Sequence, residues 1–240
     1  MSGELIESPF HPGERTAQLL AGSSPRGATI RDWMPDQHRA FFAALPFVLT
    51  ATTDAAGWPV ATVLAGAPGF IASPDPWTLR IAARRDCDDP AAQWLKPEAS
   101  IALLGIDLTT RRRNRANGVI AAATERALVV AVRESFGNCP QYIHIRDLEV
   151  VPAKPATEVM NGLDQPAREA IEAADTFFVA TSGGAVGVDI SHRAGRPGFV
   201  RLDGNTLTIP RRGALPFRWS LRAHSPSVVW TGSWNELAAV

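Results

Sequence analysis

The segment FVLTATTDAAGWPVATVLAG, residues 47–66, decides which fold the sequence predicts. Its first part, Phe47–Thr53, is rich in β-branched and apolar residues, as strands are. The sequence Asp54-Ala55-Ala56-Gly57 is typical of a hairpin turn, and residues 58–66 predict a return strand. The segment therefore predicts an antiparallel β-hairpin.

The sequence beyond this hairpin continues the same pattern. Five more short strands are predicted, at residues 69–73, 77–83, 100–108, 118–124 and 127–135. Short helices are predicted at residues 35–45, where Asp32 is the expected N-cap, and at residues 89–95 and 139–146. Short strands with tight turns and few helices predict a mainly β fold, built as an antiparallel sheet or barrel.

One stretch of the sequence occurs twice. AGAPGFI at residues 65–71 recurs as AGRPGFV at residues 194–200, with five of seven positions identical and an offset of 194 − 65 = 129. Two further pairs of segments match at nearly the same offset: residues 45–57 with 175–187, and residues 78–81 with 206–209. Three matches in register indicate a duplication.

The duplication divides the chain into four parts. These are an N-terminal arm and helix at residues 1–41, a first barrel domain at 42–155, a second, partial barrel domain at 156–210, and a divergent tail at 211–240. The tail resembles nothing in the first copy, and two explanations stay open. It is either a divergent cap or the product of a lost native ending, which would leave the second barrel with unpaired strand edges.

Charge and cysteine content exclude several classes of protein. Lys and Arg together number 24, as do Asp and Glu, so the net charge of zero gives no general attraction to nucleic acid or an anionic membrane. Only Lys96 and Lys154 are lysines, so 24 − 2 = 22 residues are arginine, a bias typical of GC-rich bacterial coding. Cys87 and Cys139 show no CxxC spacing, which favours a reducing compartment. The acidic start MSGELIESPF, and the lack of an apolar run of about 18 residues, predict a cytoplasmic protein outside membranes.

Two segments are specific enough to suggest a family: LGIDLTTRRRNRANG at residues 104–118 and DISHRAGRPGFV at residues 189–200. Four more segments support them, at residues 10–15, 30–47, 64–76 and 135–143. Together they span residues 10 to about 210. The chain resembles the pyridoxamine 5′-phosphate oxidase-related FMN-binding proteins of the flavin split-barrel fold.

This resemblance implies antiparallel barrels that hold FMN where two barrels meet. Many such proteins are homodimers, and a tandem copy would supply both barrels from one chain, so a homodimer stays open here. The expected fold is mainly β: tandem antiparallel split β-barrels, the second incomplete, with a few short helices. The expected function is that of an FMN-dependent oxidoreductase whose partners are the flavin and an unknown small-molecule substrate or electron donor. A deazaflavin or haem as ligand, and a non-catalytic, truncated binding or scaffold protein, are the alternatives.

The segment Ser191-His192-Arg193, next to Gly195, is the first candidate site for the cofactor. A bidentate arginine, a hydroxyl group and backbone donors suit the dianionic phosphate of FMN. Strand alternation places Ser191 and Arg193 on one face of a strand and His192 on the other. The alternative for this segment is an exposed polar strand end.

Arg111, Arg112 and Arg113 are secondary candidates for cofactor binding. They are predicted to lie in a turn, where a solvated turn, a contact to a cofactor or acidic substrate, and salt bridges all stay open. Nucleic acid is the least favoured partner, because no aromatic stacking residues accompany the arginines. Cys139 is either a thiol at a helix start or a small buried residue. No histidine spacing predicts a metal site, and no dinucleotide-binding, phosphate-loop or GxSxG motif occurs, so no catalytic residue is assigned.

Overall fold

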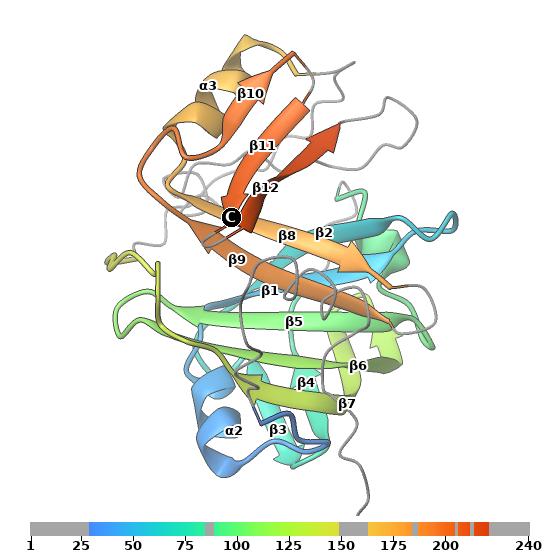
Figure 1. Ribbon diagram of the computed structural model, residues 1–240. Coiled ribbons are helices and arrows are strands. Elements are labelled where there is room, and N and C mark those ends of the chain that lie inside the picture. The colour runs from blue at the N-terminus through green and yellow to red at the C-terminus, as the bar shows by residue number, and fades with distance from the viewer. Residues whose placement is uncertain are drawn as a thin grey trace, which may run out of the picture.

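The computed structural model describes residues 29–84, 89–148, 163–183, 187–204, 206–211 and 214–220. The fold is mainly β, as predicted, with helices α2 (Asp36–Ala43) and α3 (Gln165–Ala173) and one 3-10 turn, η1 (Ala92–Trp94). Figure 1 shows their arrangement. Most of the predicted N-terminal arm, Cys87 and most of the predicted tail lie outside the described residues.

The first half of the chain forms one antiparallel sheet of seven strands in the order β2-β1-β5-β6-β7-β4-β3. Its strands are β1 (Phe47–Thr53), β2 (Pro59–Ala65), β3 (Ile71–Asp75), β4 (Thr78–Ile81), β5 (Ser100–Asp107), β6 (Arg112–Thr124) and β7 (Ala127–Gly137).

The predicted β1–β2 hairpin is confirmed, and its turn has a clear local cause. Oδ1 of Asp54 accepts hydrogen bonds from the backbone N–H groups of Ala56 at 2.9 Å and Trp58 at 2.8 Å. Gly57 has a φ of 83°, a conformation that glycine adopts without the steric cost of a Cβ. The turn residues identified in the sequence therefore direct the chain back along β1.

Strands β1 and β5 are buried on both faces. One face of the sheet packs against α2 in a first hydrophobic cluster that includes Phe42, Leu45 and Leu103. The other face carries a second cluster that includes Leu49 and Leu104. Successive residues of β5 thus point into different clusters, as strand alternation requires.

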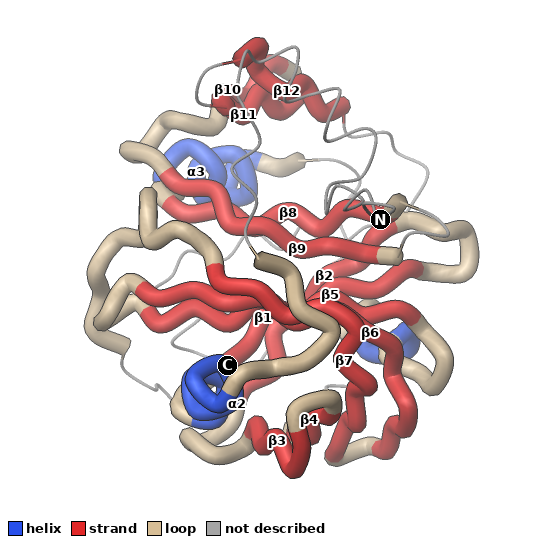
Figure 2. Tube along the Cα trace, turned by 60° about the horizontal axis from the view of Figure 1, so that its bottom comes forward, coloured by secondary structure: helices blue, strands red, loops and turns tan. Residues whose placement is uncertain are grey.

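The second half of the chain supplies α3 and two small sheets. Their strands are β8 (Thr176–Ser182) paired with β9 (Val188–Ala194), and β10 (Arg201–Asp203), β11 (Thr206–Arg211) and β12 (Ala214–Ser220) in one sheet. The β8–β9 hairpin lies against β1, β2 and β5, where Val188 and Ile190 complete the second cluster. Figures 1 and 2 both place this hairpin between the large sheet and α3.

The first hairpin recurs in the second half with the same spacing. Shifted by 129 residues, β1 and β2 become residues 176–182 and 188–194, which are the bounds of β8 and β9. The cross-strand partners shift by the same amount along both strands. The alignment of residues 45–57 with 175–187 is therefore wrong by one position, since it needs an offset of 175 − 45 = 130.

The turn that follows each hairpin has the same geometry. The N–H of Gly66 donates to the carbonyl of Pro46 at 3.0 Å, and the N–H of Gly195 donates to that of Asp175 at 3.0 Å. A Cβ at either glycine would lie 2.6 or 2.7 Å from the side chain of the phenylalanine four residues later. Only glycine fits this turn without a shift of that side chain.

The helix predicted at residues 139–146 does not form. Residues 138–148 contain only a turn at 141–142. The carbonyls of Cys139 and Pro140 instead accept hydrogen bonds from the guanidinium groups of Arg113 and Arg111. Side chains of β6 and of the turn before it thus take acceptors that a helix would have used.

Two predicted boundaries also differ from the structure. Helix α2 begins at Asp36, so Asp32 lies too early to cap it, and the N-cap position is held by Pro35 without a side-chain hydrogen bond. The domain boundary predicted at residue 210 falls inside β11, and residues 214–220 of the predicted tail form β12.

Candidate functional site

Arg113 and His192 connect the two halves of the molecule. Nη1 of Arg113, near the start of β6, lies 2.8 Å from Nδ1 of His192 on β9. A guanidinium group only donates, so Nδ1 accepts, and the ring proton of neutral His192 sits on Nε2. Nη2 of Arg113 also donates to the backbone carbonyl of Cys139 at 3.0 Å. His192 is 4% exposed, so its contact with Arg113 is largely buried.

A second pair of side chains joins the same two strands. Nη1 of Arg115 lies 2.7 Å from Oδ2 of Asp189, and these side chains are 14% and 33% exposed. Because Arg113 and Arg115 are two positions apart on β6, both side chains leave the strand on the side of β9. We call Arg113, Arg115, Asp189 and His192 the junction cluster.

Four polar atoms of the junction cluster are buried without a hydrogen-bond partner among the described residues. They are Nε of Arg113, Nε of Arg115, Nε2 of His192 and Oδ1 of Asp189, three donors and one acceptor. Leaving such an atom unpaired costs about 1–3 kcal/mol. Native proteins therefore satisfy nearly all of them with protein groups, ordered water or a ligand. The surplus of donors fits a bound group that is rich in acceptor atoms.

The junction cluster carries excess positive charge at neutral pH. Burial, followed by the charges of Arg115 and Arg193, lowers the pKa of Arg113 to about 10. Burial, followed by the charges of Arg113 and Arg193, lowers the pKa of His192 from 6.5 to about 3. At pH 7 the imidazole is neutral, and two arginines accompany one aspartate, so the net charge of the cluster is 2 − 1 = +1. This excess favours an anionic ligand.

The lowered pKa of His192 predicts loss of stability in acid. Between pH 6.5 and about 3 the unfolded chain binds a proton at this position that the folded chain does not. The free energy of unfolding should therefore fall with decreasing pH through this window, by up to about 1.4 kcal/mol per pH unit. His192→Gln should show a shallower fall, measured by urea denaturation at several pH values between 6.5 and 4.5. Parallel pH dependences in the two proteins would contradict the neutral, buried imidazole.

The structure divides the first group of predicted site residues. His192 enters the junction cluster through its contact with Arg113, and its neighbour Ser191 is also buried. By strand alternation, Ser191 and Arg193 share a face of β9 with Asp189, and His192 lies on the other face. Nη1 of Arg193 donates to the backbone carbonyl of His192 at 3.1 Å, and the Arg193 charge acts on the cluster. Gly195 serves the turn after β9 described above.

The three predicted arginines also point in different directions. Arg111 has a φ of 57°, is exposed, and donates to the carbonyl of Pro140 at 3.3 Å. The Arg112 guanidinium lies 5.1 Å from the centre of the Phe41 ring, on the side of α2. Only Arg113 reaches β9.

Sequence reasoning missed Arg115 and Asp189 as site residues. The prediction of a turn over all the arginines is wrong beyond residue 111, because β6 already pairs with β5 at Arg112 and Asp107. Arginines at 113 and 115 then share one face of a strand. The two-residue spacing of these arginines was the available signal. It predicts a shared face only once β6 is known to start at Arg112.

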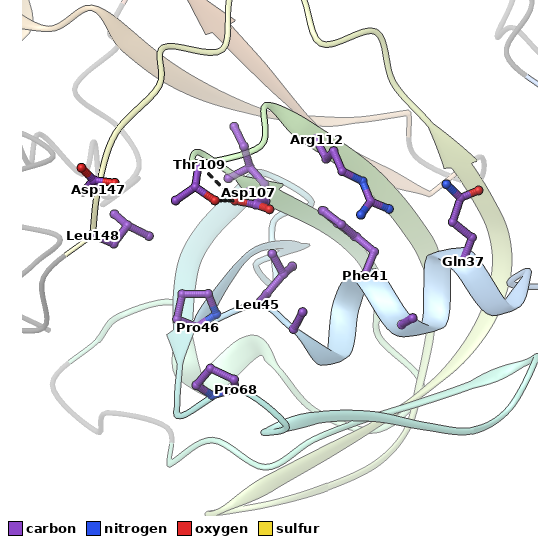
Figure 3. Close-up of a pocket in the computed structure, with 13 residues that line it drawn as sticks. Gln37, Phe41, Leu45, Pro46, Pro68, Asp107, Thr109, Arg112, Asp147 and Leu148 are labelled. Carbon is purple, nitrogen blue, oxygen red and sulfur yellow. Dashed lines mark hydrogen bonds between the residues drawn. The ribbon is translucent and has the colours of Figure 1, made fainter.

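A cleft of about 600 Å³ lies between α2 and the β5–β6 turn (Figure 3). Phe41, Leu45 and Ile106 give it apolar walls, and Asp107 and Arg112 are among its polar residues. Burial raises the pKa of Asp107, but hydrogen bonds from Thr110 and Thr109 outweigh burial and hold it below its usual value.

The junction cluster is the stronger candidate site, although it does not line this cleft. Two charged groups of the cleft already have partners within the protein: Asp107 accepts hydrogen bonds from its own turn, and Arg112 stacks on Phe41. The junction cluster instead has buried donors without partners and an excess of charge. Unmet donors and uncompensated charge are features that a ligand would relieve.

Within the described ranges, no three or more His, Cys, Asp or Glu side chains lie together as a possible metal site. None of the helices in that part of the chain is long and apolar enough to cross a membrane.

Comparisons with known proteins yield distant structural similarity. No family model and no curated protein matches the sequence. A protein of Lactobacillus delbrueckii, provisionally described as a pyridoxamine 5′-phosphate oxidase, matches with 18% identity and a TM-score of 0.35, covering 44% of this chain and 95% of its own. HupZ of group A Streptococcus matches with 12% identity and a TM-score of 0.35, covering 43% and 93%. An FAD and heme binding protein of Mycobacterium smegmatis matches with 15% identity and a TM-score of 0.33, covering 58% and 95%, and we draw nothing about function from scores this low.

Proposed function

We propose that the chain binds FMN at the junction cluster. The observation that carries this proposal is a set of three buried N–H donors, on Arg113, Arg115 and His192, that have no partner among the described residues. The resemblance of residues 104–118 and 189–200 to FMN-binding split-barrel proteins points to the same place, since these segments contain all four residues of the cluster.

The chemistry of FMN suits these residues. Its phosphate is a dianion, which the net positive charge of the junction cluster would attract. Its ring system carries carbonyl and nitrogen acceptors that match N–H donors. Arg113 and Arg115 would hold the anionic or acceptor-rich part of the ligand by charge-assisted hydrogen bonds, and Nε2–H of His192 would add a neutral donor. Asp189 would keep the Arg115 guanidinium in place through their ion pair.

The reaction class follows from the cofactor. A bound flavin supplies hydride or electron transfer, while the protein provides binding, orientation and electrostatics. We therefore propose an FMN-dependent oxidoreductase of the cytoplasm, acting with a small-molecule substrate or electron donor that is not yet assigned. A haem or deazaflavin would use the same donors and is a different outcome of the binding test.

One observation favours a second candidate, a non-catalytic binding or scaffold protein. In the described residues, β8–β9 and β10–β11–β12 remain two separate sheets, so the second half leaves strand edges that are unpaired within them. Open edges can pair with other chains. This candidate predicts colourless protein whose apparent mass rises with concentration in gel filtration.

The test of FMN binding is a visible absorbance spectrum of the purified protein after soaking with FMN and desalting. We expect about one flavin to be retained per chain, and riboflavin, which lacks the phosphate, to be retained less well. The difference arises because riboflavin offers no anion to the junction cluster. If no flavin is retained after soaking, the proposal is wrong. Equal retention of riboflavin would show that the junction cluster does not bind the phosphate of FMN.

A further inference from the structure

The contacts between the two hairpins are reciprocal. Strand β1 contacts β9 and β2 contacts β8, while β1 also contacts β8. Because β8 and β9 correspond to β1 and β2 at an offset of 129, exchanging the two hairpins exchanges these contacts. A two-fold interface between identical copies has this property: residue i contacts residue j, and j contacts i. The two hairpins therefore pack as an internal pseudo-dimer.

We infer that this internal pseudo-dimer carries one anion site per chain, at the junction cluster, and that its symmetry-related counterpart has no such site. The inference rests on the proposed function for the nature of the ligand. The number of sites is argued separately, from the residues of β2 that correspond to Asp189 and His192 of β9.

The counterparts of Asp189 and His192 are hydrophobic. Subtracting the offset gives 189 − 129 = 60 and 192 − 129 = 63, which are Val60 and Val63 of β2. Val60 is 8% exposed, and Val63 packs against the second hydrophobic cluster. Neither side chain donates or accepts a hydrogen bond. Arginine side chains that approached β2 in the way that Arg113 and Arg115 approach β9 would therefore face two valines. They would find no carboxylate and no imidazole there.

The polar counterpart in β2 is already used within the protein. Thr62 corresponds to Ser191, since 191 − 129 = 62, and its Oγ1 donates to Oδ2 of Asp89. The two hairpins are thus alike in backbone and register but differ in the chemistry they offer. A two-fold dimer of identical subunits would have two equivalent sites, whereas this junction is expected to have one.

The test counts sites by isothermal titration calorimetry at low ionic strength, with FMN and, separately, with inorganic pyrophosphate. We expect one equivalent of each per chain. His192→Val gives β9 the residue that β2 carries, and it should weaken both ligands about 10- to 100-fold by removing a buried donor to a charged acceptor. The matched control Val63→Ala changes the counterpart in β2 and should leave affinity and stoichiometry unchanged.

The possible outcomes separate this inference from the flavin proposal. One equivalent of pyrophosphate without FMN binding supports the single site and contradicts the flavin. The single site is contradicted, even where FMN binds, if the chain binds two equivalents or half an equivalent of either ligand. It is also contradicted if half of the sites survive in His192→Val. Binding of neither ligand overturns both. The wild-type stoichiometry decides the matter even if a variant fails to fold.

Discussion

Replacing Arg113 with methionine should weaken FMN binding by about 30-fold or more. The guanidinium donates to His192 and to the Cys139 carbonyl, and it carries one of the positive charges of the junction cluster. Methionine keeps an apolar stem but neither the donors nor the charge. Truncating one partner of a buried, hydrogen-bonded charge pair costs about 2–5 kcal/mol, and 2 kcal/mol corresponds to about 30-fold in Kd. Quenching of FMN fluorescence measures the Kd directly.

Arg111→Met is the matched control for this substitution. Arg111 carries the same charge two positions earlier, but it is exposed and donates to the Pro140 carbonyl at 3.3 Å, away from β9. An exposed charge contributes little, so we expect its Kd to change less than about threefold. If both substitutions weakened binding equally, the ligand would be held by the general field of the arginines and not by the junction cluster.

Gly118→Ala should cost about 3 kcal/mol of stability or more. A Cβ at Gly118 would lie 2.0 Å from the backbone oxygen of Ala131 and 3.1 Å from Cα of Val132, both on β7. These are backbone atoms, so no side-chain rotation relieves the clash and the strands must separate. Guanidinium chloride denaturation followed by circular dichroism measures the loss.

We expect Gly118→Ala to disturb the junction cluster as well as the fold. The pairing of β6 with β7 shifts between Asn117 and Gly118, so the glycine sits at a bulge three residues beyond Arg115. Gly137→Ala is the control in the same pair of strands, because its Cβ would meet nothing closer than 3.5 Å. It should cost less than about 1 kcal/mol. Similar losses in both variants would show that the cost comes from strand propensity and not from the close approach at Gly118.

The parts of the fold that the sequence predicted have local causes. The β1–β2 turn depends on Asp54 and Gly57, and both lie within the segment that forms it. Helix α2 was found because its apolar residues follow helical spacing, but its N-cap was placed too early, at Asp32, whereas Pro35 occupies that position. The predicted helix at 139–146 failed because its carbonyls bind arginines from another element.

The junction cluster is beyond local sequence reasoning. Arg113 and His192 are 79 positions apart, and Arg115 and Asp189 are 74 apart. Strand alternation places His192 on the opposite face of β9 from Ser191 and Arg193, but it does not say which strand His192 will face. That choice depends on the packing of β9 against β1 and β5, which is set by apolar residues of β1, β5, β8 and β9 and not by the polar residues themselves.

The double burial of β1 and β5 has a consequence for how the protein unfolds. Leu103 and Leu104 are neighbours in one strand, yet each belongs to a different hydrophobic cluster. Opening β5 would therefore expose both clusters at once, and neither half of the molecule can melt there without the other losing part of its interior. We therefore expect the amide protons of β5 to exchange among the slowest of the protein, and the two halves to unfold as a single cooperative unit centred on this strand.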